Sequence, residues 1–382
     1  MLERTIYLDH AATTALDRRV LDAMIPYLTT EYGNASSIYT LGRHAMQAID
    51  SAREQVAEIL NCRPTEITFT GCGSESDNLA IKGMAFTSQK KGNHIITSSI
   101  EHHAVLHTCQ YLERFGFKTS YLPVDSYGCV DPDEVGRAIT DQTILVSIMY
   151  ANNEVGTIEP IAEIGRICRA RKIPFHVDAV QAGGSLPIDV SALNVDLLSL
   201  SSHKFYGPKG VGILYARQGM RILPQLQGGS QERGKRAGTE NVSGIVGAAT
   251  ALRLAYEDLS QIQPRIIALR DRLVSGILTI PGSHLTGHPT ERLPNNASFV
   301  FEGVEGESIL LSLDLLGIAA STGSACTSGS VDPSHVLLAM GLPVELAHGS
   351  LRITLGKDNT GEDVETIVSA LPGIIEKLRG LR

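Results

Sequence analysis

The sequence contains no tryptophan, and its aromatic residues make up only 5% of 382 residues. It has no uninterrupted apolar run long enough to span a bilayer, and no stretch of signal-peptide type at its beginning. Lysine and arginine form no dense block, and the formal net charge is −8, which argues against nucleic acid as a direct partner. These absences predict a globular cytoplasmic protein that binds neither a membrane nor nucleic acid.

Cysteine is present but never in a paired arrangement. Six cysteines are scattered along the chain without a CxxC pair: Cys62, Cys72, Cys109, Cys129, Cys168 and Cys326. This spacing disfavours both a disulfide framework and a thiolate metal site, and it is typical of a reducing cytosol. We therefore expect no intrinsic metal site.

The middle of the chain alternates between strand and helix patterns. The segment 143–150 is apolar almost throughout, as expected of a strand that is covered on both faces. Other strands are predicted at 66–70, 94–98, 175–178, 196–200 and 212–215. Helices are predicted between them at 75–87, 102–114 and 161–172. Strands separated by helices indicate an α/β domain with a mostly parallel sheet.

The flanking regions have a different pattern. From Leu41 to Ile59, apolar residues recur at three- and four-residue steps, which places them on one face of a helix. A long helical region from about 241 to 278, broken near Pro264, follows the sheet. The remainder is predicted to have strands at 297–301 and 351–355 and helices at 307–316 and 363–378.

Two domains are expected from this organisation, since the chain is long enough for two packed cores. The larger, α/β domain is predicted to cover 14–255. A smaller α+β domain is predicted to consist of 1–13 and 256–382.

Polar residues follow five of the predicted strands where each strand ends. They lie in separate segments, around Ser74, His102, Asn153, Asp178 and Lys204. In an open parallel sheet, ligands bind in the crevice beyond the carboxyl ends of the strands. The fold itself would therefore bring these segments together.

The chemistry of these segments suggests pyridoxal phosphate. Glycines in 71–76, between a strand and a helix, would bring backbone N–H groups toward a phosphate, although Ser76 breaks the dinucleotide pattern. A lysine such as Lys204 can hold an aldehyde as a Schiff base, and Asp178 can hold a proton on a pyridine nitrogen. Each signal alone has a simpler interpretation: a tight turn with Ser74 as helix N-cap, and a solvated surface lysine. Their combination is specific for a pyridoxal phosphate site.

Cys326 lies within 321–330, a segment made almost wholly of small and hydroxyl residues. Such a segment cannot anchor itself in a core, so we expect a mobile surface loop. An accessible thiol there would serve as a nucleophile or as the carrier of a transferred atom. The alternative is an ordinary flexible loop with an inert free cysteine.

Eight strings cover nearly the whole chain in order: YLDHAATT (7–14), GSESDNLA (73–80), EHHAV (101–105), NNEVGT (152–157), HVDAVQ (176–181), SSHKFYGPKG (201–210), RAGTENV (236–242) and GSACTSGS (323–330). In these strings the chain resembles the NifS/IscS-type cysteine desulfurases. The resemblance implies a homodimeric fold-type-I pyridoxal phosphate enzyme of the class-V aminotransferase family, with a seven-stranded, mostly parallel sheet in its large domain. It also implies the conversion of L-cysteine to L-alanine, with the sulfur kept as a persulfide.

The resemblance further implies individual catalytic roles. Lys204 would be the Schiff-base lysine and proton shuttle, and His102 would stack on the cofactor ring. Asp178 would pair with the ring nitrogen, and Gln181 would donate a hydrogen bond to the phenolic oxygen. Cys326 would take the substrate sulfur.

The same resemblance implies a phosphate site and a substrate site. Gly73, Ser74, Ser201 and His203 would surround the phosphate, and Thr239 would reach in from the partner subunit. Asn153, beside the cofactor, and Arg352 would bind the substrate carboxylate, a task that suits the fork of a guanidinium group. The alternative for Arg352 is a surface ion pair.

The sulfur acceptor stays open. The chain ends at Arg382, soon after its last predicted helix, without the longer C-terminal tail that housekeeping members of the family use to dock a cluster scaffold. This departure argues against docking to such a scaffold and leaves tRNA or cofactor thiolation and a dedicated cluster pathway as the expected routes. In a complex with a scaffold, Cys326 would be a ligand of the iron–sulfur cluster.

Three alternative functions compete with cysteine desulfuration. A selenocysteine lyase is not excluded by the sequence. Another class-V aminotransferase would need no mobile thiol. A non-catalytic sulfur-relay subunit would be expected to have lost Lys204 or Cys326, and both are present.

Overall fold

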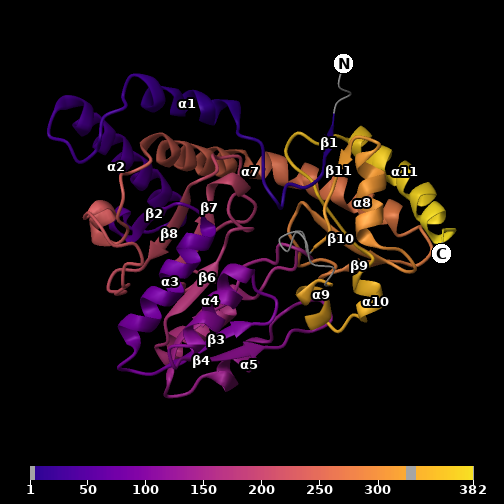
Figure 1. The fold of residues 1–382 in the computed structure, drawn as a ribbon, viewed down its shortest axis with the longest axis horizontal. Helices are drawn as coiled ribbons and strands as arrows, with labels where there is room; N and C mark the ends of the chain where they lie inside the picture. Colours follow the sequence, from indigo (N-terminus) through magenta and orange to yellow (C-terminus); the bar gives the residue numbers. More distant parts are fainter. Residues whose placement is uncertain (1–4, 324–332, 382) are drawn as a thin grey trace.

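The computed structural model describes residues 5–323 and 333–381. Its largest sheet has seven strands in the order β2-β8-β7-β6-β5-β3-β4 (Figure 1). The strands are β2 (Ile67–Thr70), β3 (His94–Ser98), β4 (Lys118–Leu122), β5 (Thr143–Ser147), β6 (Phe175–Asp178), β7 (Leu197–Ser201) and β8 (Gly212–Ala216). Only β8 runs antiparallel to its neighbours. The predicted α/β class with a mostly parallel seven-stranded sheet is confirmed.

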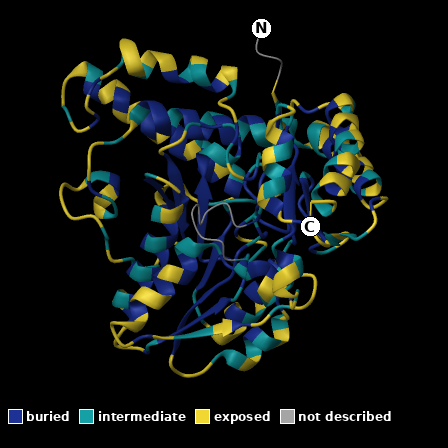
Figure 2. Ribbon diagram, turned by 45° about the vertical axis from the view of Figure 1, so that its right-hand side comes forward, coloured by how far each residue is buried: buried dark blue, intermediate teal, exposed yellow. Residues whose placement is uncertain are grey.

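Helices cover both faces of this sheet, so its strands other than the edge strand β4 are buried (Figure 2). One face packs against α3 (Gly73–Ser88) and α4 (His103–Glu113), and their shared core includes Leu145 and Leu197. The opposite face packs against α2 (Thr40–Leu60), α6 (Ile161–Arg171) and part of α7 (Val242–Ile277). Neighbouring residues of β5 alternate between these cores, with Leu145 in one and Val146 in the other, which explains why this strand is largely apolar.

A second, smaller body is built on an antiparallel sheet in the order β12-β10-β9. Its strands are β9 (Ser283–Thr286), β10 (Asn296–Phe301) and β12 (Ser350–Thr354). The main helices are α8 (Gly306–Asp314) and α11 (Gly361–Arg379), and a short parallel pair joins β1 (Ile6–Tyr7) to β11 (Ile318–Ala319). Its core contains Leu8, so the start of the chain packs with its end.

The prediction that the long helix breaks near Pro264 is wrong, because α7 runs unbroken from Val242 to Ile277. Proline removes one backbone hydrogen bond and disfavours the helix. Packing on both sides of the proline offsets this cost: Leu252 lies in the core of the large body, whereas Leu273 lies in that of the small body. Helix α7 therefore links the two bodies as one continuous element.

Several elements were absent from the sequence prediction. They include α1 (Arg18–Thr29), which packs on α7, α5 (Pro132–Ala138), which packs on α6, and the short helices α9 (His335–Ala339) and α10 (Val344–Ala347). Strands β1, β4, β9 and β11 were missed as well. None of the helices within residues 5–323 and 333–381 is long and apolar enough to cross a membrane.

Candidate active site

A cavity of about 320 Å³ lies beyond the carboxyl ends of β2, β3, β5, β6 and β7. Ten of the predicted site residues line it: Gly73, Ser74, His102, Asn153, Asp178, Gln181, Ser201, His203, Lys204 and Arg352. Thr239 is not among the lining residues and is exposed to solvent. Cys326 lies outside the described residues. The structure thus brings together the five strand-end segments, while the roles of their residues stay predictions.

The amino end of α3 forms one wall of the cavity. Gly73 is the first residue of this helix, and a Cβ added to it would lie 2.7 Å from Cγ2 of Val180 and 3.1 Å from Cβ of Ser201. Glycine is required here by space. Because the first turn of a helix has unpaired N–H groups and a partial positive charge, this wall suits an anion.

The interpretation of Ser74 as the helix N-cap is wrong. The N-cap is Cys72, whose Sγ accepts a hydrogen bond from the Glu75 N–H at 3.4 Å. The helix begins two residues earlier than expected because the backbone of Cys72 is extended and Gly73 already belongs to the helix. Ser74 is therefore left facing the cavity.

Asp178 is a buried carboxylate at the end of β6, with 5% of its surface exposed. Its Oδ1 accepts a hydrogen bond from the Val180 N–H at 3.0 Å. The other carboxylate oxygen makes no hydrogen bond within the described part of the chain. Burial raises the pKa of Asp178 to about 6, and the positive charge of Lys204 opposes this rise. A cation in the cavity would stabilise this carboxylate, so the site fits a protonated pyridine nitrogen.

Lys204 ends the short 3-10 helix Ser202–Lys204 that follows β7. Its Nζ donates hydrogen bonds to the backbone oxygens of Ala11 and, at 2.9 Å, Ala12. Gln181 Nε2 donates to the same Ala11 oxygen at 3.0 Å. Residues near the beginning of the chain therefore complete the surroundings of the lysine, although it lies on the large body.

Sequence reasoning did not assign a role to Ala11, Ala12 or Thr14. The N–H and Oγ1 of Thr14 each donate to the backbone oxygen of His203 at 2.9 Å. Thr14 Oγ1 also accepts a hydrogen bond from the Tyr206 N–H at 2.7 Å. The only signal that could have found these residues is the string YLDHAATT, which has no chemical feature of its own.

Both histidines of the cavity are neutral near pH 7. Burial, reinforced by the positive charge of Lys204, lowers the pKa of His102 to about 4, and that of His203 to about 4 as well. His102 Nδ1 accepts the Ala104 N–H at 3.1 Å and thereby caps α4. A neutral imidazole fixed in this way suits stacking on an aromatic ring.

Arg352 enters the cavity from β12 of the small body. The alternative of a surface ion pair is wrong, because only 4% of the residue is exposed. Its Nη1 donates to the backbone oxygen of Asn153 at 2.8 Å, and Nη2 donates to Asp9 Oδ1 at 2.8 Å. Nε has no hydrogen-bond partner within the described residues. A carboxylate entering the cavity would find a guanidinium group whose position is already fixed.

A buried polar group, not predicted from the sequence, lies behind Asp178. Asp77, from α3, lines the cavity with 1% exposure, and its Oδ1 is 3.6 Å from Nε2 of the fully buried His176. His176 makes hydrogen bonds with Ser147 at 2.8 Å and Ser199 at 3.0 Å. Burial raises the pKa of Asp77 well above its usual range, with the charge of Asp178 adding to the effect. The alternation of β6, with His176 and Asp178 on one face, was the available signal.

Comparison with protein families matches residues 6–367 to the family described as aminotransferase class-V. The chain belongs to this family. It is 56% identical to "Cysteine desulfurase IscS" of Methanosarcina thermophila over 378 residues, which are 99% of this chain and 94% of the relative. A protein of the same description from Clostridium botulinum is 54% identical over 381 residues, or 99% and 96% of the two chains.

Solved structures agree with this relationship. A structure described as a NifS-like protein superposes with a TM-score of 0.93 and 43% identity, covering 98% of this chain and 100% of the other. A second, described as SspA in complex with cysteine, has a TM-score of 0.83 and 37% identity, covering 93% of this chain and 100% of the other. The two relatives are thus named cysteine desulfurase, and one of the similar solved structures is described as a complex with cysteine.

Proposed function

We propose that this protein is a pyridoxal phosphate-dependent cysteine desulfurase that converts L-cysteine to L-alanine and keeps the sulfur as a persulfide on Cys326. The observation that carries the proposal is the convergence of Lys204, Asp178 and Arg352 on one cavity. This arrangement occurs in a chain that is similar over nearly its full length to proteins named cysteine desulfurase.

The cavity residues fit pyridoxal phosphate. The amino end of α3 at Gly73 and Ser74, with Ser201 and His203, would hold the phosphate. Asp178 would hold the pyridine nitrogen, because its buried carboxylate lacks a second partner. When bound, the cofactor supplies an aldehyde that condenses with amines and a ring that withdraws electrons from carbon.

Three further residues would complete the cofactor site. The neutral ring of His102 would stack on the pyridine ring, and Gln181 Nε2 would donate a hydrogen bond to the phenolic oxygen. Thr239 would reach the phosphate of the partner subunit, in keeping with its exposure to solvent and its position outside the cavity of its own chain.

The protein's own groups would then perform the reaction. Arg352 and Asn153 orient the substrate carboxylate. The Lys204 amine would move the proton at the substrate Cα. The Cys326 thiolate attacks the substrate sulfur: an S–S bond forms, the substrate C–S bond breaks, and the carbon that keeps the bonding electrons gains a proton to become the alanine methyl group.

We also propose a homodimer and a protein as sulfur acceptor. Three large apolar side chains before and at the start of α2 are exposed: Tyr32 by 70%, Ile38 by 90% and Tyr39 by 56%. A partner subunit would cover them. The acceptor would be an iron–sulfur scaffold, with Cys326 as a cluster ligand in that complex, or an enzyme that thiolates tRNA or a cofactor.

The decisive experiment is to add L-cysteine without reductant and map the persulfide by mass spectrometry. The expected result is one extra sulfur atom on Cys326. The Cys326→Ser variant should still change its absorption when cysteine is added, yet release almost no alanine. Cys72→Ser is the matched control: Cys72 lines the cavity but caps α3, so its variant should keep most activity.

Two results would contradict the proposal. Normal alanine release by Cys326→Ser would make the thiol incidental and favour a lyase that expels sulfur directly. If the wild type releases alanine from L-selenocysteine but not from L-cysteine, the chain would be better described as a selenocysteine lyase.

A further inference from the structure

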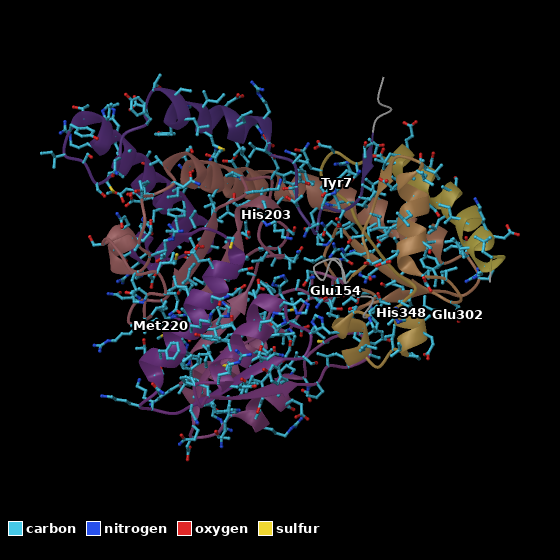
Figure 3. The ribbon with its side chains drawn as sticks, viewed as in Figure 1. Tyr7, Glu154, His203, Met220, Glu302 and His348 are labelled. Carbon is cyan, nitrogen blue, oxygen red and sulfur yellow. The ribbon has the colours of Figure 1, made fainter. Side chains whose placement is uncertain are left out.

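Glu154 is a buried glutamate at the junction of the two bodies, and Figure 3 shows it there. Its backbone is fixed on both sides. Asn152 Oδ1 accepts hydrogen bonds from the Glu154 N–H at 2.8 Å and the Val155 N–H at 3.0 Å. Asn296 of β10 donates to the Glu154 backbone oxygen at 3.2 Å. The side chain therefore starts from a rigid position.

The carboxylate contacts the two described ends of the chain that flank the segment 324–332. On the far side of the segment, Ser334 Oγ donates a hydrogen bond to Glu154 Oε2. The same Oγ accepts the N–H groups of Val336 at 3.1 Å and Leu337 at 3.3 Å, so it also begins α9.

On the near side, Gly323 packs directly against the same oxygen. A Cβ added to Gly323 would lie 2.3 Å from Glu154 Oε2 and 3.4 Å from Glu154 Cβ. Only glycine can occupy this position without displacing the carboxylate. The same oxygen atom thus accepts the Ser334 hydrogen bond and leaves room only for glycine at position 323.

Burying a carboxylate costs free energy, so a side chain that only filled this space would be apolar. Glu154 is 5% exposed, and burial raises its pKa, while the Ser334 hydrogen bond and the positive charge of Arg352 oppose the rise. The neighbouring Asn153 backbone oxygen binds Arg352. The carboxylate is thus retained in the same turn that orients the proposed substrate-binding arginine.

We infer that Glu154 is a positioning residue for sulfur transfer, which sets both ends of the Cys326 segment relative to Asn153 and Arg352. The inference rests on the proposed function, because it assigns Cys326 the role of sulfur acceptor. Glu154 itself does not line the cavity, so binding of cofactor and substrate should not depend on it.

The test compares Glu154→Gln with Glu159→Gln in the cofactor-loaded protein. Glu159 is a matched control: it lies in the same segment, is 2% exposed and accepts the Val130 N–H at 2.8 Å. We expect Glu154→Gln to keep the cofactor absorption, the spectral change on adding L-cysteine and the KM. Its rate of persulfide formation on Cys326 should fall by roughly tenfold to a hundredfold, as for a reacting group displaced by a fraction of an ångström to an ångström. Glu159→Gln should not combine an unchanged KM with slower persulfide formation.

A double-mutant cycle tests whether Gly323 acts through Glu154. Gly323→Ala should slow persulfide formation in the wild-type background, because its Cβ collides with the carboxylate. In the Glu154→Ala background, the same substitution should add little further loss. Ser334→Ala removes the other contact and should slow the same step, so the cycle does not depend on one variant being stable.

Alkylation of Cys326 by iodoacetamide separates positioning from reactivity. The thiol of Glu154→Gln should react with iodoacetamide no more slowly than the wild type. Equal persulfide formation in Glu154→Gln and the wild type, or additive effects in the cycle, would overturn the inference and leave the proposed function intact. A wild-type protein that forms no persulfide would instead overturn the proposed function itself.

Discussion

At the scale of single residues, the candidate site concentrates buried charges whose partners within the chain are incomplete. Asp178 uses one carboxylate oxygen, and Arg352 has an unpaired Nε within the described residues. Buried charges without full pairing are costly and cluster where a ligand completes them. We therefore expect a ligand bound in the cavity to stabilise the folded protein.

Replacing Lys204 by alanine should abolish alanine formation, because no other amine lines the cavity among the described residues. Cofactor binding should become weak and non-covalent, since the phosphate and ring contacts remain. Borohydride reduction of the wild type followed by peptide mapping should place the cofactor on Lys204. Lys209, five residues further on, is the control: cofactor found there would contradict the assignment.

Replacing Asp178 by asparagine should preserve the cavity, because an amide oxygen can still accept the Val180 N–H. It removes the charge that would hold a proton on the pyridine nitrogen. At about pH 8, where the wild-type carboxylate with its pKa of about 6 is ionised, turnover should fall by roughly two to three orders of magnitude. Near-normal turnover would show that Asp178 only ends a strand.

At the scale of elements, the ends of strands and helices decide what the site contains. His176 and Asp178 point to the same face of β6 because side chains alternate along a strand. Likewise, α3 begins at Gly73, so its unpaired N–H groups are directed toward the cavity.

Sequence patterns predicted most of these elements but not all. The predicted strands 94–98 and 175–178 match β3 and β6, whose residues are all buried in the sheet. Strand β4 was missed because it is an edge strand with an exposed start, and its residues Lys118–Leu122 lack an apolar pattern. Likewise, eight candidate residues lie in the strand-end segments, and Gln181 and Arg352 were implied by the family resemblance, whereas Ala11 and Ala12 act through backbone oxygens that no residue type reveals.

Glu101, in the connection between β3 and α4, should make the stability of the protein depend on pH. Burial raises the pKa of Glu101 from 4.5 to about 8. Between these values the folded state holds a proton that the unfolded state has lost, so stability falls as pH rises. Above about pH 6.5, ordinary histidines are neutral in the unfolded state and the buried ones remain neutral, so they do not mask this slope.

Glu101→Gln imitates the protonated carboxyl, and the replaced Oε2 has no hydrogen-bond partner in the described part of the chain. As the pH rises from about 6.5 to 8, the free energy of unfolding of the wild type should fall more steeply than that of the variant. The two slopes should differ by up to about 1.4 kcal/mol per pH unit. Urea unfolding at several pH values measures this slope. Parallel curves for the two proteins would show that Glu101 is already ionised when folded.

At the scale of the whole molecule, the cavity lies where two bodies meet. Arg352 comes from the small body, whereas Asp178 and Lys204 come from the large one. We propose that the domains divide as expected, at 14–255 and at 1–13 with 256–382, which places the boundary inside α7. A continuous helix across a boundary limits relative motion, which suits a site built from both bodies.

The proposed dimer leads to the last prediction, which concerns Thr239. If Thr239 completes the partner's phosphate site, a Thr239→Ala chain still offers a complete Lys204, and a Lys204→Ala chain still offers Thr239. A mixed dimer of the two therefore contains one intact site, whereas neither homodimer does. Unfolding and refolding the two variants together should raise desulfurase activity above the average of the separate variants.

The contact that makes such mixing possible should depend on the exposed apolar residues near α2. Ile38→Glu should convert the protein from twice 41.0 kDa to a single chain in light scattering and weaken cofactor binding, because Thr239 can no longer reach the other site. Leu315→Glu is the matched control, since Leu315 is 87% exposed on the small body. If Ile38→Glu keeps the mass of the dimer, the subunit interface lies elsewhere on the molecule. If the mixed Thr239→Ala and Lys204→Ala variants still form dimers but gain no activity, Thr239 does not act across subunits.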